Sequence, residues 1–170
     1  LSGIDGGILE AEVKNEALGY VGRITKVRTK PIEDLLENHY IPVISTVASD
    51  HNGNSYNING DTAAAVIAGA LGAERLIMMT DIAGVLKDID NPDSLISQIS
   101  VKEAESLKAD GIISGGMIPK VDCCIEAIRL GTKKVTILDG RVPHALLIET
   151  MTNEGAGTMV VKEKKDAHEF

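Results

Sequence analysis

The stretch Gly60–Gly84, GDTAAAVIAGALGAERLIMMTDIAG, decides the fold class of this chain. Its alanine-rich first part predicts a helix over 60–72 that ends near Gly72, because a glycine can close the last helical turn. The apolar run Arg75–Thr80 follows directly and predicts a buried strand. A helix that leads at once into a buried strand is typical of an α/β protein with a parallel sheet.

The rest of the chain repeats this alternation. Strands are predicted at 8–13, 19–28, Tyr40–Ala48, Lys133–Asp139 and Gly157–Val161, with a hairpin-like turn at 50–54. Helices are predicted at Pro31–His39, at 101–110 after a Ser100–Glu103 capping box, from Ile118 up to Gly131, and at Pro143–Met151. The predicted fold is therefore a three-layer α/β/α sandwich with a mostly parallel open sheet. It forms one domain over 1–162, followed by a charged tail at 163–170.

Composition argues against two classes of partner. The net charge of −8 disfavours general affinity for nucleic acid or anionic membranes, although it leaves room for a local basic phosphate pocket. No apolar run approaches the roughly 20 residues of a membrane span.

Cys123 and Cys124 are adjacent, so a disulfide between them would be strained. These features predict a reducing, cytoplasmic location.

Three polar residues precede the helix at 60–72. In an extended run, Asn57, Asn59 and Asp61 face the same way, so two amides and a carboxylate meet at the start of this helix. Ligands collect at such places in an α/β sheet, where strands end and helices begin. The alternative is a plain turn in which Asp61 caps the helix.

Two further loops follow predicted elements. Thr80–Gly84 comes directly after a strand, a place where Asp81 can hold a ribose hydroxyl or order a lysine. The alternative is an ordinary turn, for which the Asp-x-x-Gly pattern is common. Gly111–Lys120 carries adjacent glycines before a helix, which allow backbone N–H groups to approach a phosphate. Lys120 then lies where the helix dipole disfavours a cation, and a bound phosphate would remove that conflict. A solvated lysine is the alternative, at a cost of a few tenths of a kcal/mol.

No other constellation predicts chemistry. The four histidines, His39, His51, His144 and His168, lack metal-ligand spacing, and no residue is assigned to a metal. No motif for nucleophilic catalysis is present.

Three longer blocks resemble the acetylglutamate kinases of the amino acid kinase family. They are YNINGDTAAAVIAGALGAERLIMMTDIAGVL (56–86), GGMIPKVDCCIEAI (115–128) and DGRVPHALLIETMTNEGAGTM (139–159). The similarity runs from LSGIDGG at the start to GAGTM, nearly the whole chain. It implies an open α/β sandwich that phosphorylates the side-chain carboxylate of N-acetyl-L-glutamate with ATP and Mg²⁺, in arginine biosynthesis.

The resemblance also implies residue roles. Asn57 binds acetylglutamate and Asn59 lines the same pocket. Asp61 orients the catalytic lysines, and Lys120 stabilises the charge on the transferred phosphoryl group. The nucleotide-binding residues are Thr80, Asp81, Ile82, Ala83, Gly84, Val85, Leu86, Ile112, Ile113, Ser114, Gly115, Gly116 and Met117.

Regulation is implied at the end of the chain. His144, Asn153, Gly155 and Gly157 match the arginine site of the arginine-sensitive members, although a helix, a turn and a closing strand would explain them as well. Homo-oligomers and a PII-type signal protein are the further partners that the resemblance implies.

Two departures from the family qualify these expectations. Gly60 stands where many relatives have alanine, which loosens the helix start modestly. The family's opening Gly-Gly-Lys loop, with a second catalytic lysine, and its substrate-binding Gly-Gly pair and arginine are not in this sequence. The chain is therefore expected to be the carboxy-terminal, nucleotide-binding part, with the amino-terminal lobe absent, and to be inactive alone. The alternatives are a non-catalytic nucleotide-binding or arginine-responsive fragment, or a kinase acting on aspartate or glutamate.

Overall fold

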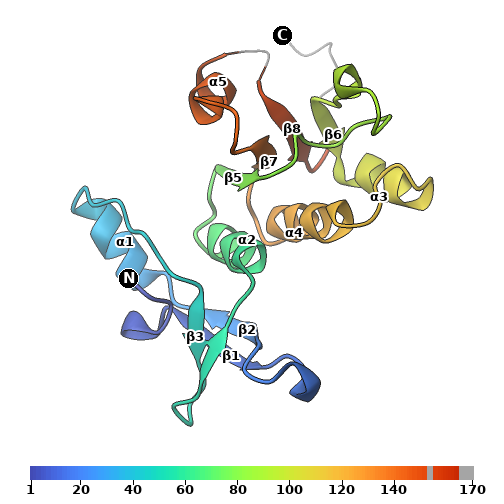
Figure 1. Ribbon diagram of the computed structural model, residues 1–170. Helices are drawn as coiled ribbons and strands as arrows, with labels where there is room; N and C mark the ends of the chain where they lie inside the picture. The colour runs from blue at the N-terminus through green and yellow to red at the C-terminus, as the bar shows by residue number, and fades with distance from the viewer. Residues whose placement is uncertain (153–154, 165–170) are drawn as a thin grey trace. The chain divides into compact units, whose positions relative to one another are not determined.

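The computed structural model describes residues 1–152 and 155–164. Contacts within the chain divide it into two compact units, Leu1–Leu71 (unit 1) and Gly72–Phe170 (unit 2). Each unit has its own four-stranded sheet (Figure 1). The single domain over 1–162 stays a prediction.

The sheet of unit 1 has the order β2-β1-β3-β4. Strands β1 (Leu9–Val13) and β2 (Gly22–Val27) form an antiparallel pair, β3 (Val47–Ser49) lies parallel to β1, and β4 (Ser55–Asn57) lies antiparallel to β3. The turn between β3 and β4 confirms the predicted hairpin. The Asp50 carboxylate closes it, because it accepts the backbone N–H groups of Asn52 and Asn54 at 2.9 Å each.

Two helices, α1 (Lys30–Glu37) and α2 (Gly60–Ala70), belong to unit 1. Ile32 of α1 and Ala63 of α2 are buried in the same apolar core as Ile8 and Leu9. Asp61 does not cap α2, so the alternative considered for this residue is wrong. Asn59 is the N-cap of α2, since the Asn59 side-chain oxygen accepts the backbone N–H of Thr62 at 3.1 Å.

The predicted buried strand Tyr40–Ala48 is wrong over most of its length. Tyr40, Ile41 and Val43 are 64%, 89% and 78% exposed, and regular strand structure begins only at Val47. The backbone here pairs with the first residues of the chain, where the Leu1 amino group donates to the Val43 carbonyl at 2.8 Å. Apolar, β-branched composition favours a strand only where neighbours cover it.

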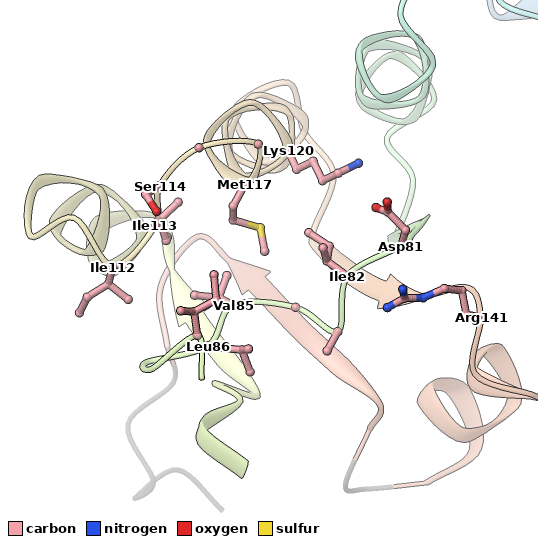
Figure 2. A pocket seen from close by; sticks show the side chains of 15 residues that line it. Asp81, Ile82, Val85, Leu86, Ile112, Ile113, Ser114, Met117, Lys120 and Arg141 are labelled. Carbon is pink, nitrogen blue, oxygen red and sulfur yellow. The ribbon is translucent and has the colours of Figure 1, made fainter. Parts of the chain in front are cut away.

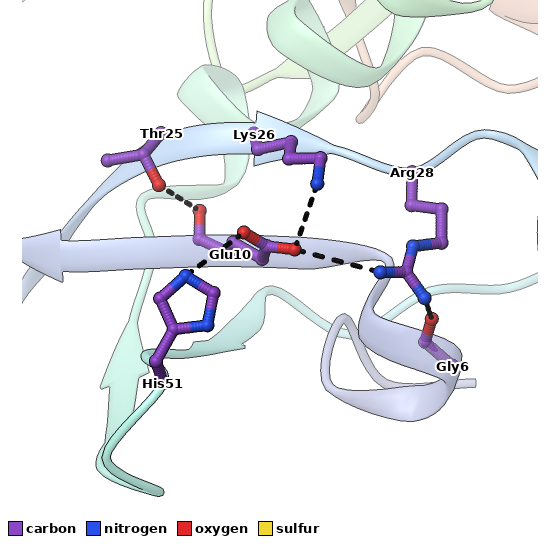
Figure 3. A network of polar contacts seen from close by, with 6 residues as sticks. All are labelled: Gly6, Glu10, Thr25, Lys26, Arg28 and His51. Atoms are coloured by element: carbon purple, nitrogen blue, oxygen red, sulfur yellow. Dashed lines mark hydrogen bonds and ion pairs between the residues drawn. The ribbon is translucent and has the colours of Figure 1, made fainter.

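A charged cluster joins β1, β2 and the β3–β4 turn on the surface of unit 1 (Figure 3). The Glu10 carboxylate lies 3.4 Å from Lys26 Nζ, 3.8 Å from an Arg28 Nη and 3.6 Å from His51 Nε2. Arg28 also donates to the Gly6 carbonyl at 3.2 Å. The cations are exposed, so solvent screens these pairs and their contribution to stability is small.

The sheet of unit 2 has the order β5-β7-β8-β6. Its strands are β5 (Arg75–Thr80), β6 (Gln98–Ser100), β7 (Lys134–Asp139) and β8 (Gly157–Val161). The pairs β5–β7 and β6–β8 are parallel, whereas β7–β8 is antiparallel. The α/β class is therefore confirmed, but the single, mostly parallel sheet is replaced by two mixed sheets. In unit 1 the cause is the hairpin connections, because short turns can only join antiparallel strands.

Helices cover both faces of the sheet in unit 2 (Figure 1). Helix α4 (Met117–Arg129) packs on one face, where Cys124 Sγ lies 3.5 Å from Met78 Sδ. Helix α5 (Ala145–Met151) lies on the other face, where the Thr136 hydroxyl donates to the Glu149 carboxylate at 3.1 Å. Met78 pairs with Ile137, the neighbour of Thr136, and successive strand residues point to opposite faces. Unit 2 thus has the predicted three layers.

The remaining helix, α3 (Val101–Ala109), begins at the predicted capping box. Ser100 Oγ accepts the Glu103 N–H at 3.2 Å, and the Glu103 carboxylate accepts the Ser100 N–H at 2.7 Å. No helix in the described part of the chain is long and apolar enough to cross a membrane.

Candidate functional site

A cavity of about 620 Å³ lies in unit 2, between the loop after β5 and the loop before α4 (Figure 2). Its lining residues are Asp81–Leu86, Ile89, Ile112–Met117, Lys120 and Arg141. The apolar side chains of Ile112, Val85 and Leu86 gather at one end, and the charged groups of Lys120, Asp81 and Arg141 at the other (Figure 2). The cavity therefore offers an apolar and a polar half to one ligand.

The loop after β5 is anchored from beneath by Thr158 of β8. The buried hydroxyl of Thr158 accepts the N–H of Val85 at 2.8 Å and donates to the carbonyl of Ile96 at 2.7 Å. Gly84 packs against the same hydroxyl with φ +139°, and a Cβ there would lie 2.5 Å from Thr158 Oγ1. Only glycine fits both this backbone conformation and this contact.

The loop before α4 is anchored by Ile113, which is 1% exposed and donates its N–H to the Leu107 carbonyl at 3.0 Å. Gly115 has φ +54°, and no atom lies within 4 Å of where a Cβ on Gly115 or Gly116 would be. The backbone is therefore open to a ligand at the start of α4. Lys120, half-buried near that end of the helix, reaches into the same cavity.

Arg141 lines the cavity and is held by Asp139, a buried residue outside the lining. The Arg141 Nε and Nη2 donate to the two carboxylate oxygens of Asp139 at 2.9 and 2.8 Å, and the Arg141 backbone N–H donates to the same carboxylate at 2.9 Å. Hydrogen bonding to the Arg141 side chain lowers the pKa of Asp139 to about 2. The pKa of Arg141 is raised, chiefly by Asp139 and less by Asp81.

All the predicted nucleotide-binding residues except Thr80 line this cavity. Thr80 ends β5, and its hydroxyl donates to Asp81 Oδ1 at 3.1 Å. Sequence reasoning missed Ile89 and Arg141. Arg141 carries a usable signal, since Asp-Gly-Arg follows a buried strand. Ile89 carries no such signal, because its place in the lining of the cavity depends on the path of a long loop.

The predicted substrate residues lie in unit 1, at the end of β4 and the start of α2. Tyr56 and Ile58 are buried while Asn57 and Asn59 are exposed, which confirms the alternation that the spacing predicts. Asp61 follows in the first turn of α2. Its joint action with Lys120 of unit 2 stays a prediction.

The predicted regulatory positions have different local roles. His144 lies before α5 with φ 61°, whereas Gly155 follows this helix and would place a Cβ 2.9 Å from the Glu149 carboxylate. A Cβ on Gly157 would run into the Ile137 carbonyl of β7. Asn153 lies outside the described residues. Glu149, which sequence reasoning missed, is 6% exposed and accepts the Ala156 N–H at 2.9 Å.

The sequence model of the amino acid kinase family matches residues 1–139. The chain belongs to the amino acid kinase family. The chain is 51% identical over 162 residues to the acetylglutamate kinase of Thermosynechococcus vestitus, covering 95% of this chain and 55% of that protein. It is 52% identical over 163 residues to the acetylglutamate kinase of Clostridium beijerinckii, covering 94% of this chain and 57% of that protein. The chain thus spans about half the length of these relatives.

Solved structures share the fold. The N-acetylglutamate synthase of Neisseria gonorrhoeae, complexed with coenzyme A and L-arginine, matches with a TM-score of 0.81 and 28% identity, covering 96% of this chain and 38% of the synthase chain. The carbamate kinase of Giardia lamblia, bound to AMP-PNP, matches with a TM-score of 0.61 and 24% identity, covering 84% of this chain and 47% of the carbamate kinase chain. The latter likeness shows the fold alone.

Proposed function

We propose that this amino acid kinase acts in the ATP-dependent phosphorylation of the side-chain carboxylate of N-acetyl-L-glutamate, in arginine biosynthesis. The observation that carries the proposal is the cavity of unit 2, in which two glycine-containing loops meet one lysine. The acetylglutamate kinases, at 51% and 52% identity over nearly the whole chain, support the choice of substrate.

The cavity fits a nucleotide with Mg²⁺ in a defined direction. The adenine ring packs at the apolar end, beside Ile112 and Leu86, because an apolar aromatic ring gains most from burial there. The phosphates lie at the open backbone of Gly115 and Gly116, where the amino end of α4 favours negative charge. Asp81 offers a carboxylate of the kind that holds Mg²⁺ together with nucleotide phosphates.

The reaction joins a carboxylate oxygen of acetylglutamate to the γ-phosphorus of ATP. The bond from that phosphorus to the bridging oxygen breaks, its electron pair leaves with ADP, and an acyl phosphate forms. Lys120 stabilises the negative charge on the transferred group, and Asn57 and Asn59 hold the acceptor substrate. Positioning and electrostatic stabilisation are what such a transfer requires, so no protein nucleophile is needed.

Nucleotide binding by the 170-residue chain tests the first half of this proposal. Calorimetric titration with MgATP is expected to show weak binding that Lys120→Gln weakens further. Lys133→Gln is the matched control, because Lys133 pairs with Glu74 on the surface of unit 2, outside the cavity. If the unaltered chain binds no ATP, or if both variants weaken binding equally, the nucleotide assignment is wrong.

Acetylglutamate-dependent release of ADP tests the second half. A complete form, with the length of the relatives, is expected to release ADP from MgATP only when acetylglutamate is added. Aspartate or glutamate supporting the same rate would redirect the proposal to another amino acid kinase.

We also propose that arginine regulates this kinase, and Glu149 is the observation that favours it. Its carboxylate is buried between Thr136 of β7 and the turn at Gly155, and a buried carboxylate suits a guanidinium partner. The synthase from Neisseria gonorrhoeae, which resembles this chain, was solved with L-arginine. Calorimetry with arginine is expected to show binding that Glu149→Gln abolishes, and binding that survives this change would exclude Glu149.

A further inference from the structure

Arg141 is a second cation in the cavity of unit 2, and its side chain is held in one pose. Two of its five N–H donors, on Nε and Nη2, are taken by Asp139. The side chain of Asp139 is only 10% exposed, while that of Arg141 is 67% exposed. The buried carboxylate of Asp139 therefore holds the guanidinium in place. The remaining N–H groups of the guanidinium are left for a ligand.

The position of Arg141 is at the polar end of the cavity. Its guanidinium lies near Asp81 and on the same side as Lys120, away from the apolar end at Ile112 (Figure 2). A guanidinium presents a planar fork of donors that matches two oxygens of a phosphate, which a lysine does not. The chemistry of this end thus suits a phosphate group rather than a base or a sugar.

The side chain of Arg141 is already ordered before a ligand binds, which favours ligand binding. A free arginine side chain loses much rotamer entropy when a ligand fixes it. The two hydrogen bonds from the Arg141 guanidinium to Asp139 already order this side chain, so a ligand would lose less of its binding energy to this ordering.

We propose that Arg141 binds the phosphate chain of the nucleotide and that Asp139 is the positioning residue that holds Arg141 for this purpose. The inference rests on the proposed function, since it takes the cavity of unit 2 to be the nucleotide site. The competing interpretation is that Asp139 and Arg141 only close the turn after β7.

Calorimetry on the 170-residue chain separates the two interpretations, with MgATP and with adenosine as a probe that lacks phosphate. Arg141→Gln is expected to lower ATP affinity about 10-fold, as the loss of a charge-assisted hydrogen bond does, and to leave adenosine affinity unchanged. Arg141→Lys keeps the charge without the fork and is expected to lose less. It also serves as the test if Arg141→Gln does not fold. Arg129→Gln, at the far end of α4 where Arg129 pairs with Glu105, is expected to change neither affinity.

A double-mutant cycle tests the role of Asp139. Asp139→Asn is expected to lower ATP affinity when Arg141 is present and to have no further effect on ATP binding in the Arg141→Gln background. A residue that merely supports the fold would lower ATP and adenosine affinity in both backgrounds.

The outcomes distinguish this inference from the function on which it rests. If Lys120→Gln weakens ATP binding and Arg141→Gln does not, only the assignment of Arg141 is overturned. The same holds if Arg141→Gln weakens ATP and adenosine binding equally. If the unaltered chain binds ATP no better than adenosine, the nucleotide site itself is overturned, and the role of Arg141 with it.

Discussion

The two units present their predicted site residues in different ways. In unit 2, two loops are anchored by buried residues, Val85 and Ile113, and enclose a cavity. In unit 1, Asn57 and Asn59 stand exposed at the end of a strand and the start of a helix. The predicted nucleotide residues are thus positioned by contacts inside unit 2, whereas the predicted substrate residues Asn57 and Asn59 are exposed polar groups of unit 1.

The largest effects are expected on turnover, for one residue of each unit with a proposed role in catalysis. In a complete form of the enzyme, Lys120→Gln is expected to lower turnover about 10²–10³-fold, as the loss of a charge-stabilising group does, and to weaken ATP binding. Asp61→Asn is expected to lower turnover steeply while ATP affinity stays unchanged. The melting temperature should hardly move, because Asn59 and not Asp61 caps α2.

Measurement of kcat, ATP affinity and melting temperature on the same variants checks this contrast. A complete enzyme in which Asp61→Asn loses stability but keeps its rate would show that Asp61 supports the helix only. An Asp61→Asn variant that weakens ATP binding as much as Lys120→Gln does would remove the distinction between the units.

A smaller effect, on stability, is expected from a change in the loop that Thr158 anchors. Gly84→Ala places a Cβ against Thr158 in a backbone conformation that disfavours side chains, and overpacking of this kind costs about 1–3 kcal/mol. ATP affinity is expected to fall as well, because the loop lines the cavity. Gly116→Ala is the control for stability, since its Cβ meets no atom within 4 Å. Equal unfolding free energies of the two variants in urea would contradict the role of Thr158 as an anchor.

The corresponding change in unit 1 is expected to stabilise. Gly60 begins α2 with open space where a Cβ would be, so Gly60→Ala is expected to raise the free energy of unfolding by up to about 1 kcal/mol. Thermal and urea unfolding measure this gain. A loss of stability would mean that Gly60 is needed for the conformation of the helix start.

The smallest effect is expected on the pKa values of two carboxylates, Asp139 and Asp50, which have different hydrogen-bond partners. The pKa of Asp139 is lowered to about 2, first by the cationic side chain of Arg141, and the pKa of Asp50 is lowered to about 2, first by the neutral side chain of Asn54. Each carboxylate therefore stabilises its unit above the unfolded pKa of about 3.9, and this contribution is lost as the pH falls towards 2.

Salt should distinguish the two carboxylates. At about 1 M salt, where charges are screened within about 3 Å, the pKa of Asp139 is expected to rise towards its usual value more than the pKa of Asp50 does. Carboxyl chemical shifts followed through an acid titration measure both values. Equal responses to salt would contradict the ionic origin of the shift at Asp139.

Local signals explain why much of unit 2 could be predicted. The capping box at Ser100 and Glu103 and the glycine that ends α4 act through neighbours in the sequence, so sequence reasoning found α3 and α4. The two predicted nucleotide loops stood out by an Asp-x-x-Gly pattern and by adjacent glycines before a helix, and the resemblance then assigned them to the nucleotide. Thr158, the anchor of the loop after β5, could not be predicted, because it comes from a strand more than 70 residues away from that loop.

Long-range packing explains the failures. Tyr40–Ala48 has the composition of a buried strand, but burial depends on neighbours that the local pattern does not specify. Glu149 gave no signal, because a glutamate within a helix is ordinarily a surface residue and its burial follows from the contact with Thr136. The mixed pairing of the sheets likewise depends on the connections between strands rather than on the strands themselves.

The exposure of Tyr40, Ile41 and Val43 has a consequence for solubility. An extended, apolar and β-branched segment on a surface can pair with the same segment of another molecule and so begin aggregation. Pro42 lies in the middle of this segment and has no N–H to donate to an incoming strand. Pro42 therefore makes this exposed segment a poorer template for an incoming strand.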